Sequence, residues 1–147
     1  MTNYDDATRG EFQTEYAKQL VSFEGLKFKG RNGINNVTPT DIDGLVQLDN
    51  EKCFIFFELK HSGDVPSGQR NALAKLADAI QANGTDCVVF VAEHNTPYPE
   101  TITAKDAIVT RIYWRGNWRE RSKRNTLHKE ISNYIQYINK TREEQTK

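Results

Sequence analysis

Residues 40–60 read TDIDGLVQLDNEKCFIFFELK and carry most of the information about the fold. Two apolar stretches of strand-like composition, about Asp41–Leu48 and Cys53–Lys60, flank the short polar segment Asp49-Asn50-Glu51-Lys52. Asn favours the left-handed backbone conformations that tight hairpin turns need. The stretch therefore predicts two antiparallel strands joined by a tight turn.

The register of this hairpin brings acidic residues together. A turn centred between Asn50 and Glu51 pairs residues whose numbers sum to 101, so Asp43 lies opposite Glu58 with Cβ atoms about 4.5–5.5 Å apart. Side chains alternate along a strand, which puts Lys60 on the same face as Glu58. Two like charges repel on an otherwise apolar hairpin, and carboxylate oxygens suit a hard divalent ion. The pattern predicts an Mg²⁺ or Mn²⁺ site.

An ordinary charge cluster at a sheet end is the alternative interpretation. Asp41 could balance Lys60 there, and a Glu-x-Lys spacing by itself is common and uninformative. The combination of Asp43-Gly44, an apolar hairpin and acids in register favours the metal site.

The segments before the hairpin predict three elements. Phe12, Tyr16, Leu20 and Phe23 form an apolar stripe, which indicates a helix over about Thr8–Glu24 that Gly25 ends. A short strand at Leu26–Lys29 follows, and then a long loop over Gly30–Thr40.

The segments after the hairpin predict two more helices around a buried strand. A helix over about Ser67–Ala82 ends at Asn83-Gly84, and the apolar run in Thr85–Ala92 indicates a strand buried on both faces. A strand at Ala107–Trp114, a turn at Arg115–Trp118 and a helix over about Lys123–Thr141 complete the chain. The expected inner faces of the two helices are Leu73, Leu76, Ala77 and Ile80, and Leu127, Ile131, Tyr134, Ile135 and Ile138.

The element order predicts an α/β fold, a mixed β-sheet flanked by helices in the order α-β-β-β-α-β-β-α. The length of 147 residues suits a single domain, 1–147, with a basic C-terminal hairpin and helix over about 107–141. Residues 111–147 carry 10 basic and 4 acidic side chains, although the whole chain has 20 of each and a net charge of zero. A strongly basic DNA-coating protein is therefore excluded.

Composition also bounds the class of protein. Hydrophobic residues make up 37% and charged residues 27%, which is typical of a folded domain. No apolar stretch is long enough for a transmembrane helix, and the polar start does not look like a secretory signal. Cys53 and Cys87 lie inside apolar runs, so we expect buried, reduced thiols in a cytoplasmic protein.

The site residues resemble those of a known enzyme superfamily. Asp43-Gly44-Leu45, Glu58-Leu59-Lys60 and Gln69 together look like the PD-(D/E)xK nuclease motif, within a region of about Thr8–Ala92 whose element order is similar to the restriction-endonuclease-like core. The resemblance implies metal-dependent hydrolysis of phosphodiester bonds, usually in DNA. It implies that Asp43, Glu58 and the backbone carbonyl of Leu59 ligate Mg²⁺ or Mn²⁺.

The same resemblance implies roles for two neighbours of the metal ligands. Lys60 would orient or deprotonate the attacking water, and Gln69 would support the catalytic residues or the phosphate. The chain departs from the family pattern in having Ile42, not Pro, before Asp43. Asp41 is therefore an alternative ligand, although the register and the following Gly favour Asp43.

A further acid is expected from the first helix, because Holliday-junction resolvases and other members of this superfamily add one there. Glu15 lies about 95° and Glu11 about 135° from the centre of the apolar stripe. Glu15 is therefore the favoured catalytic candidate. That both are simply solvated is the open alternative.

Basic residues give candidates for nucleic-acid contact. Arg70 follows Gln69, and aromatic residues alternate with arginines between Arg111 and Arg124, a combination that suits phosphate contacts and stacking. The predicted nucleic-acid-binding residues are Arg70, Arg111, Arg115 and Arg119. We expect Trp114 and Trp118 to pack under the last helix, and we assign His61 no catalytic role.

These observations lead to a metal-dependent DNA endonuclease as the functional prediction, with a Holliday-junction resolvase-like enzyme as the leading subtype. Such an enzyme would act on branched DNA as a symmetric homodimer. The alternatives are a restriction-like or repair nuclease, and a non-catalytic module that keeps the fold to bind DNA or a protein. A compact chain of this kind would suit a bacterial or phage-encoded protein of the cytoplasm.

Overall fold

The structure, a computed structural model, describes residues 22–30, 33, 36–39, 42–48, 52–61 and 67–145 of the chain. Its contacts divide the chain into two compact units, Met1–Pro39 and Thr40–Lys147. A single domain over residues 1–147 stays a prediction.

The first unit contains a small antiparallel ribbon. Strand β1 (Phe28–Lys29) pairs with strand β2 (Asn36–Val37), so the expected loop over 30–40 includes a strand. Most of the expected helix over 8–24, including Glu15, lies outside the described residues. Its last three residues are not helical, because the Ser22 hydroxyl accepts the Glu24 amide and Gly25, at φ 83°, turns the chain.

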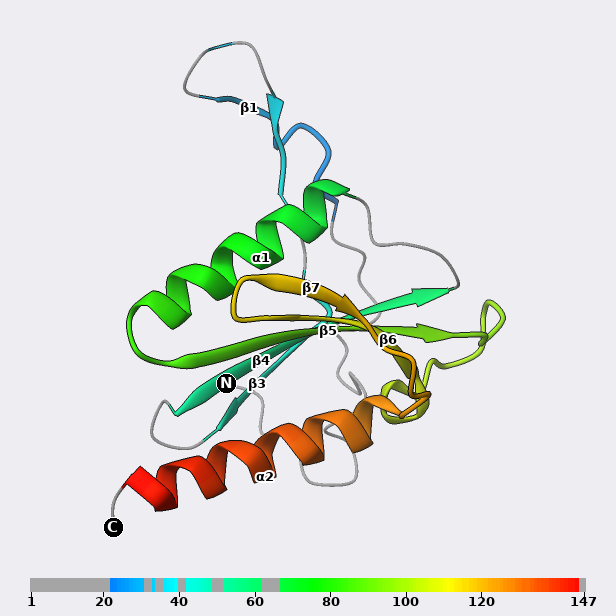
Figure 1. Cartoon of the computed structure of the whole chain (residues 1–147). Helices are drawn as coiled ribbons and strands as arrows, with labels where there is room; N and C mark the ends of the chain where they lie inside the picture. The colour runs from blue at the N-terminus through cyan, green and yellow to red at the C-terminus, as the bar shows by residue number, and fades with distance from the viewer. Residues whose placement is uncertain are drawn as a thin grey trace, which may run out of the picture. The chain divides into compact units, whose positions relative to one another are not determined.

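The second unit is a mixed five-stranded sheet between two helices (Figure 1). The strands lie in the order β3-β4-β5-β6-β7, with β4 and β5 parallel and the other neighbours antiparallel. This confirms an α/β fold with a mixed sheet. The elements are β3 (Gly44–Leu48), β4 (Cys53–His61), α1 (Ser67–Ala82), β5 (Asp86–His94), the 3₁₀ helix η2 (Ala104–Asp106), β6 (Ile108–Trp114), β7 (Asn117–Glu120) and α2 (Leu127–Gln145).

The predicted element order is wrong in missing one strand of this unit. The predicted turn at 115–118 is in part strand β7, because Arg115 and Gly116 alone make the reversal, at φ 48° and φ 83°. Two adjacent residues with positive φ give the hairpin turn whose twist matches that of the strands.

Each face of the sheet is covered by one helix. On the face that we name the α1 face, Leu73 and Ala77 of α1 pack on Phe56, Val89 and Tyr113. On the opposite α2 face, Leu127 and Ile138 of α2 pack with buried residues of β4 and β5, which are Cys53, Ile55, Val88, Phe90 and Ala92. Residues 87–92 of β5 are all buried, as the continuous apolar run predicts for a strand covered on both sides.

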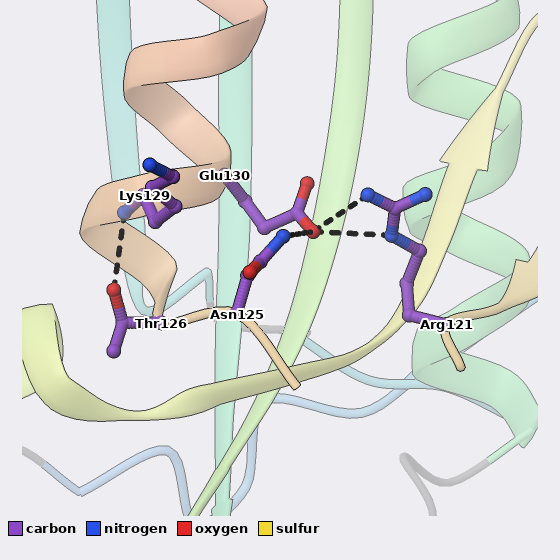
Figure 2. A network of polar contacts seen from close by, with 5 residues as sticks. All are labelled: Arg121, Asn125, Thr126, Lys129 and Glu130. Carbon is purple, nitrogen blue, oxygen red and sulfur yellow. Dashed lines mark hydrogen bonds and ion pairs between the residues drawn. The ribbon is translucent and has the colours of Figure 1, made fainter. Parts of the chain in front are cut away.

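The bounds of α1 agree with the prediction, whereas α2 starts four residues later than expected. Thr126 pairs with Ile108 as an isolated bridge, and its hydroxyl accepts the Lys129 amide at 3.1 Å, so it caps the helix (Figure 2). The apolar stripe of α2 is confirmed. Leu76 of α1 is 39% exposed and is not part of the inner face.

The start of α2 is also held by an ion pair between the buried Glu130 and the half-buried Arg121. The Glu130 carboxylate accepts hydrogen bonds from Arg121 at 2.7 and 3.1 Å and from Asn125 at 3.2 Å (Figure 2). Because Arg121 directly follows β7, this contact joins the helix to the edge of the sheet. The pair is therefore part of the fold.

Both cysteines are free and buried, as predicted. Burial raises the pKa of the Cys53 thiol to about 11 and that of Cys87 to about 12. Neither thiol is therefore activated as a nucleophile. Among the described residues, no helix is long and apolar enough to cross a membrane.

Candidate metal and phosphate site

The β3–β4 hairpin has the predicted register. Every pair of partners, from Gly44↔Phe57 to Leu48↔Cys53, has numbers that sum to 101. One step beyond the Gly44↔Phe57 pair, away from the turn, Asp43 faces Glu58. The local reason is the short polar connection, which leaves the two apolar strands one way to pair with their inner faces aligned.

Asp43 and Glu58 are connected by two hydrogen bonds next to the first residue of β3. The Asp43 amide donates to Oε1 of Glu58 at 3.2 Å, and the Leu59 amide donates to Oδ2 of Asp43 at 2.7 Å. The regular pairing of β3 with β4 ends at Gly44. Beyond that point, the Asp43 carboxylate accepts a hydrogen bond from the Leu59 amide of β4. Each carboxylate is thereby oriented by a backbone N–H group of the opposing strand.

The two acids differ in exposure. Glu58 is only 1% exposed and lies on the α1 face, because it alternates with Phe56 of the cluster under α1. Asp43 is exposed. The site is therefore a buried carboxylate next to one that solvent can reach, at the margin of an apolar sheet face.

Gly44 is required by packing at this point. A Cβ atom at Gly44 would fall within the space of the Phe57 ring, which lies across the glycine on the α2 face. The Asp-Gly pair in the sequence therefore serves two needs: Asp43 continues the contact with β4, and Gly44 leaves room for the aromatic ring.

Lys60 lies on the α1 face two residues after Glu58. Its side chain is half-buried, and the parallel register places Glu93 of β5 beside it. The ammonium group belongs to the same end of the sheet as the two acids. The arrangement agrees with the expected alternation of Glu58 and Lys60 on one face.

The other candidates have different positions. Asp41, the alternative ligand, lies outside the described residues, as does Glu15. Gln69 and Arg70 form part of the first turn of α1, and the side chain of Gln69 is likewise not described. The helix follows β4, so its first turn lies nearer to Lys60 in the chain than any other part of α1.

The predicted arginines do not form one surface. Arg111 of β6 is in register with Val91, which is in register with Glu58, so Arg111 lies on the α1 face two strands from the acids. Its guanidinium is 3.8 Å from Glu120. Arg115 lies in the β6–β7 turn beyond the level of Trp114, and Arg119 lies on the α2 face through its pairing with Ile112. Arg111 alone of these three shares the face of Glu58.

The two tryptophans are on opposite faces of the sheet. Trp114 lies under α2, with its ring 5.9 Å from that of Tyr137, as predicted. The prediction for Trp118 is wrong, because its ring lies 5.1 Å from Tyr113 on the α1 face. Adjacent strands of a hairpin pair residue by residue, and Trp118 is opposite Tyr113 rather than Trp114.

One pair of side chains was not anticipated. His61 and His94 end β4 and β5 in parallel register, and their rings lie edge to face at 5.3 Å. Nδ1 of His94 accepts the Thr96 amide at 3.2 Å, so its neutral form carries the proton on Nε2. No local pattern in the sequence signals this contact, because it depends on the register between two strands that α1 separates.

The donor set suits a hard divalent ion. Within the described part of the chain, no three His, Cys, Asp or Glu side chains converge. The candidate acidic ligands that the structure describes at this place are the carboxylates of Asp43 and Glu58. Mg²⁺ is typically held by one or two carboxylates, with water and substrate phosphate as the remaining ligands. Two oriented carboxylates at a partly exposed sheet end fit that requirement.

Comparison with known proteins finds a similar sequence that extends over most of this chain. The chain is 26% identical over 123 residues to a UPF0102 protein of Colwellia psychrerythraea, an alignment that covers 78% of this chain and 91% of that protein. The name of that protein specifies no activity. No protein-family model and no solved structure matches the chain. The comparison supports a relation over most of both chains.

Proposed function

We propose that this protein is a metal-dependent nuclease that hydrolyses phosphodiester bonds in DNA, built on a restriction-endonuclease-like core. The observation that carries the proposal is that backbone amides orient two neighbouring carboxylates. The Leu59 amide donates to Asp43, and the Asp43 amide donates to Glu58. The connection of a β3–β4 hairpin through α1 to β5, parallel to β4, supports the proposed core. The similarity to a UPF0102 protein is compatible with it.

In this proposal, Asp43 and Glu58 hold Mg²⁺ or Mn²⁺ together with the backbone carbonyl of Leu59. Such an ion polarises a phosphate and lowers the pKa of a bound water toward neutrality. The burial of Glu58 favours this role, since a carboxylate taken out of water next to a second one is stabilised by a cation.

Lys60 is proposed to act on the attacking water and on the phosphate. Its ammonium can donate hydrogen bonds to the water and to a non-bridging phosphate oxygen on the α1 face. Gln69 and Arg70 in the first turn of α1, and Glu15 from the N-terminal segment, are proposed as supporting residues. Arg111, which lies on this face, is proposed to contact the DNA backbone.

Branched DNA cut by a symmetric dimer is the finer proposal, because a four-way junction presents two equivalent strands to two identical sites. Arg115 and Arg119 are then proposed to contact DNA away from the α1 face. A restriction-like or repair nuclease, or a binding module without activity, are outcomes that the experiment separates.

The test is cleavage of junction, duplex and single-stranded DNA of one sequence in Mg²⁺ or Mn²⁺. We expect the wild-type chain to cut, and Asp43→Asn and Lys60→Met to reduce the rate at least about 100-fold. Asp106→Asn and Lys105→Met, at exposed positions of η2, are the matched controls and should cut normally. Normal cleavage by the Asp43 and Lys60 variants would refute the proposed site.

A second readout does not depend on activity. A ligand that binds only the folded chain raises its stability, by about 1.4 kcal/mol when its concentration is ten times its dissociation constant. Mn²⁺ should therefore raise the unfolding midpoint of the wild-type chain and leave that of Asp43→Asn unchanged. Metal stabilisation without cleavage would favour the non-catalytic module.

A further inference from the structure

A cavity of about 340 Å³ lies between α2 and strands β5–β7, on the α2 face of the sheet. Val88, Phe90, Ile112 and Trp114 form its floor, and these residues belong to the cluster under α2. Because Glu58 and Lys60 are on the α1 face, this cavity is separate from the proposed metal site. Its volume is at the lower end of the range for small-molecule sites.

Aromatic rings form much of the wall. The ring of Tyr134 lies 6.4 Å from Phe90 and 6.3 Å from Tyr137, and the ring of Tyr137 lies 5.9 Å from Trp114. Planar heteroaromatic rings stack on aromatic side chains regardless of their substituents. The wall therefore favours a planar aromatic ligand over a branched aliphatic one.

The lining of the cavity carries charges of both signs, which are Arg119, Arg121, Glu120 and Glu130. Glu130 is paired with Arg121, and Glu120 lies 3.8 Å from Arg111. The guanidinium groups of Arg115 and Arg119 lie 4.3 and 5.6 Å from the centre of the Trp114 ring, and both side chains are exposed. Arg121 also lines the cavity, but its guanidinium is bound to Glu130. Arg119, which lines the cavity, is thus placed to hold an anionic group attached to a ring on the aromatic wall.

Two polar atoms of the lining side chains indicate that the site is not purely apolar. Nε1 of Trp114 lies close enough to the Tyr134 hydroxyl to donate a weak hydrogen bond to it. Both atoms are buried, and neither has a hydrogen bond of full geometry in the part of the chain that the structure describes. Buried polar groups that are incompletely hydrogen-bonded are usually met by water or a ligand. A guest with hydrogen-bonding atoms on its edge would meet this requirement after a small side-chain adjustment.

We propose that this cavity binds a nucleobase that carries a phosphate group. The base would lie against Tyr134 and Trp114, and the phosphate would contact Arg119 at the rim. This chemistry is common to a free nucleotide and to an unpaired nucleotide of a nucleic-acid strand. The proposal goes beyond the nuclease site and does not depend on it.

The fold provides a selective probe of binding. The chain has two tryptophans, and Trp118 lies on the opposite face against Tyr113, so Trp118→Phe leaves Trp114 as the single reporter. In this background, dAMP, deoxyadenosine, an unpaired dA oligonucleotide and the matching duplex are titrated while Trp114 fluorescence is followed. We expect saturable quenching by dAMP or by the oligonucleotide, and little by the duplex. Stronger binding of dAMP would identify the free nucleotide as the ligand, and stronger binding of the oligonucleotide would identify a nucleic-acid strand.

Substitutions separate the parts of the ligand. Arg119→Ala should weaken binding of dAMP about fivefold to tenfold and leave deoxyadenosine unaffected, because the nucleoside lacks the phosphate. Tyr134→Phe should weaken both by a similar factor and change the unfolding midpoint little, since it removes a hydroxyl whose contact with Trp114 lacks full hydrogen-bond geometry. Arg124→Ala, which removes an exposed arginine outside the cavity lining, is the control and should bind normally.

Two results would overturn the proposal. No quenching by any of the four compounds at millimolar concentration would leave a cavity that holds water only. Quenching that neither Arg119→Ala nor Tyr134→Phe changes would place the ligand elsewhere. Because Asp43→Asn leaves the cavity intact, loss of cleavage in that variant with normal quenching would keep the two proposals distinct.

Discussion

Glu58 and Glu130 are the two charged residues that are fully buried in the described part of the chain, at 1% and 4% exposure, yet their surroundings differ. One oxygen of Glu130 receives three hydrogen bonds from Arg121 and Asn125 (Figure 2). Oε1 of Glu58 receives the Asp43 amide, and the side chain across the strands is another carboxylate.

We therefore assign Glu130 a structural role and propose a role in metal binding for Glu58. A buried carboxylate opposite a guanidinium is a compensated pair, and losing either partner leaves an unpaired charge. A buried carboxylate opposite a second carboxylate gains nothing from that neighbour in folding. A divalent cation would be attracted by both carboxylates at once, which is why the proposed function is placed at Glu58 and not at Glu130.

Activity gives the largest expected contrast between the two acids. Glu58→Gln, which keeps the shape and an acceptor oxygen, should lower the cleavage rate at least about 100-fold. Glu130→Gln should retain wild-type cleavage per folded molecule, because Glu130 lies on the α2 face at the start of α2. Rates measured on the same DNA, with folded fractions from circular dichroism, make the comparison. Equal losses in both variants would remove the distinction.

Stability should show the opposite order. Glu130→Ala leaves the Arg121 guanidinium and the Asn125 amide without their acceptor, and we expect a loss of about 3 kcal/mol in the free energy of unfolding, reduced to the extent that water reaches Arg121. Urea unfolding followed by circular dichroism measures it. A loss below about 0.5 kcal/mol would show that this pair does not hold α2 to the sheet.

A third acid, Asp78, sharpens the comparison because its partner is a neutral donor. The Tyr113 hydroxyl donates to Oδ1 of Asp78 at 2.7 Å and joins β6 to α1. Tyr113→Phe should lower the free energy of unfolding by about 1 kcal/mol near pH 7. Urea unfolding at that pH measures this loss.

The same residue has a defined pH dependence. Burial, and then the hydrogen bond to Asp78, raise the pKa of Tyr113 to about 12, against about 10 in an unfolded chain. The unfolded chain therefore loses this proton first, so the contribution is complete below about pH 10 and is lost as the pH rises toward 12. The difference in unfolding free energy between wild type and Tyr113→Phe should shrink over that interval. A constant difference would contradict the assignment.

The smallest effect is expected for Asp43→Asn without divalent ions. The asparagine oxygen can still accept the Leu59 amide, and the repulsion between the two acids is removed. We expect the free energy of unfolding to stay constant or to rise by less than about 1 kcal/mol, because Asp43 is exposed and solvent screens its charge. Unfolding in urea and a chelator tests this. A clear loss of stability would mean that Asp43 serves the fold, as Glu130 does.

Much of the site could be predicted because it is local in the sequence. The short polar segment between residues 48 and 53 restricts how its flanking strands pair, and the side-chain alternation of β4 then places Glu58 and Lys60 on one face. Helix α1 was equally predictable, because its apolar spacing and the Asn83-Gly84 pair that ends it lie within about twenty residues of sequence. The same locality explains why the buried strand β5 could be identified from its own composition.

The parts that could not be predicted depend on neighbours that are distant in the chain. The contact between His61 and His94 needs the parallel register of β4 and β5, and the separation of Arg111 from Arg119 needs the face that each strand turns to its helix. The late start of α2 needs the bridge between Thr126 and Ile108. None of these pairings is favoured by short-range propensity, because packing across the sheet decides them.

By itself, the sequence determined an α/β chain whose short hairpin sets two acids face to face and a lysine beside them. The tertiary structure alone decided that one of these acids is buried while the other reaches solvent, and that an aromatic cavity with arginines at its rim lies on the other side of the sheet. The physical reason is that hairpin register follows from chain connectivity over a few residues. Burial of side chains and the formation of cavities depend on where helices from distant segments of the chain pack on each face of the sheet.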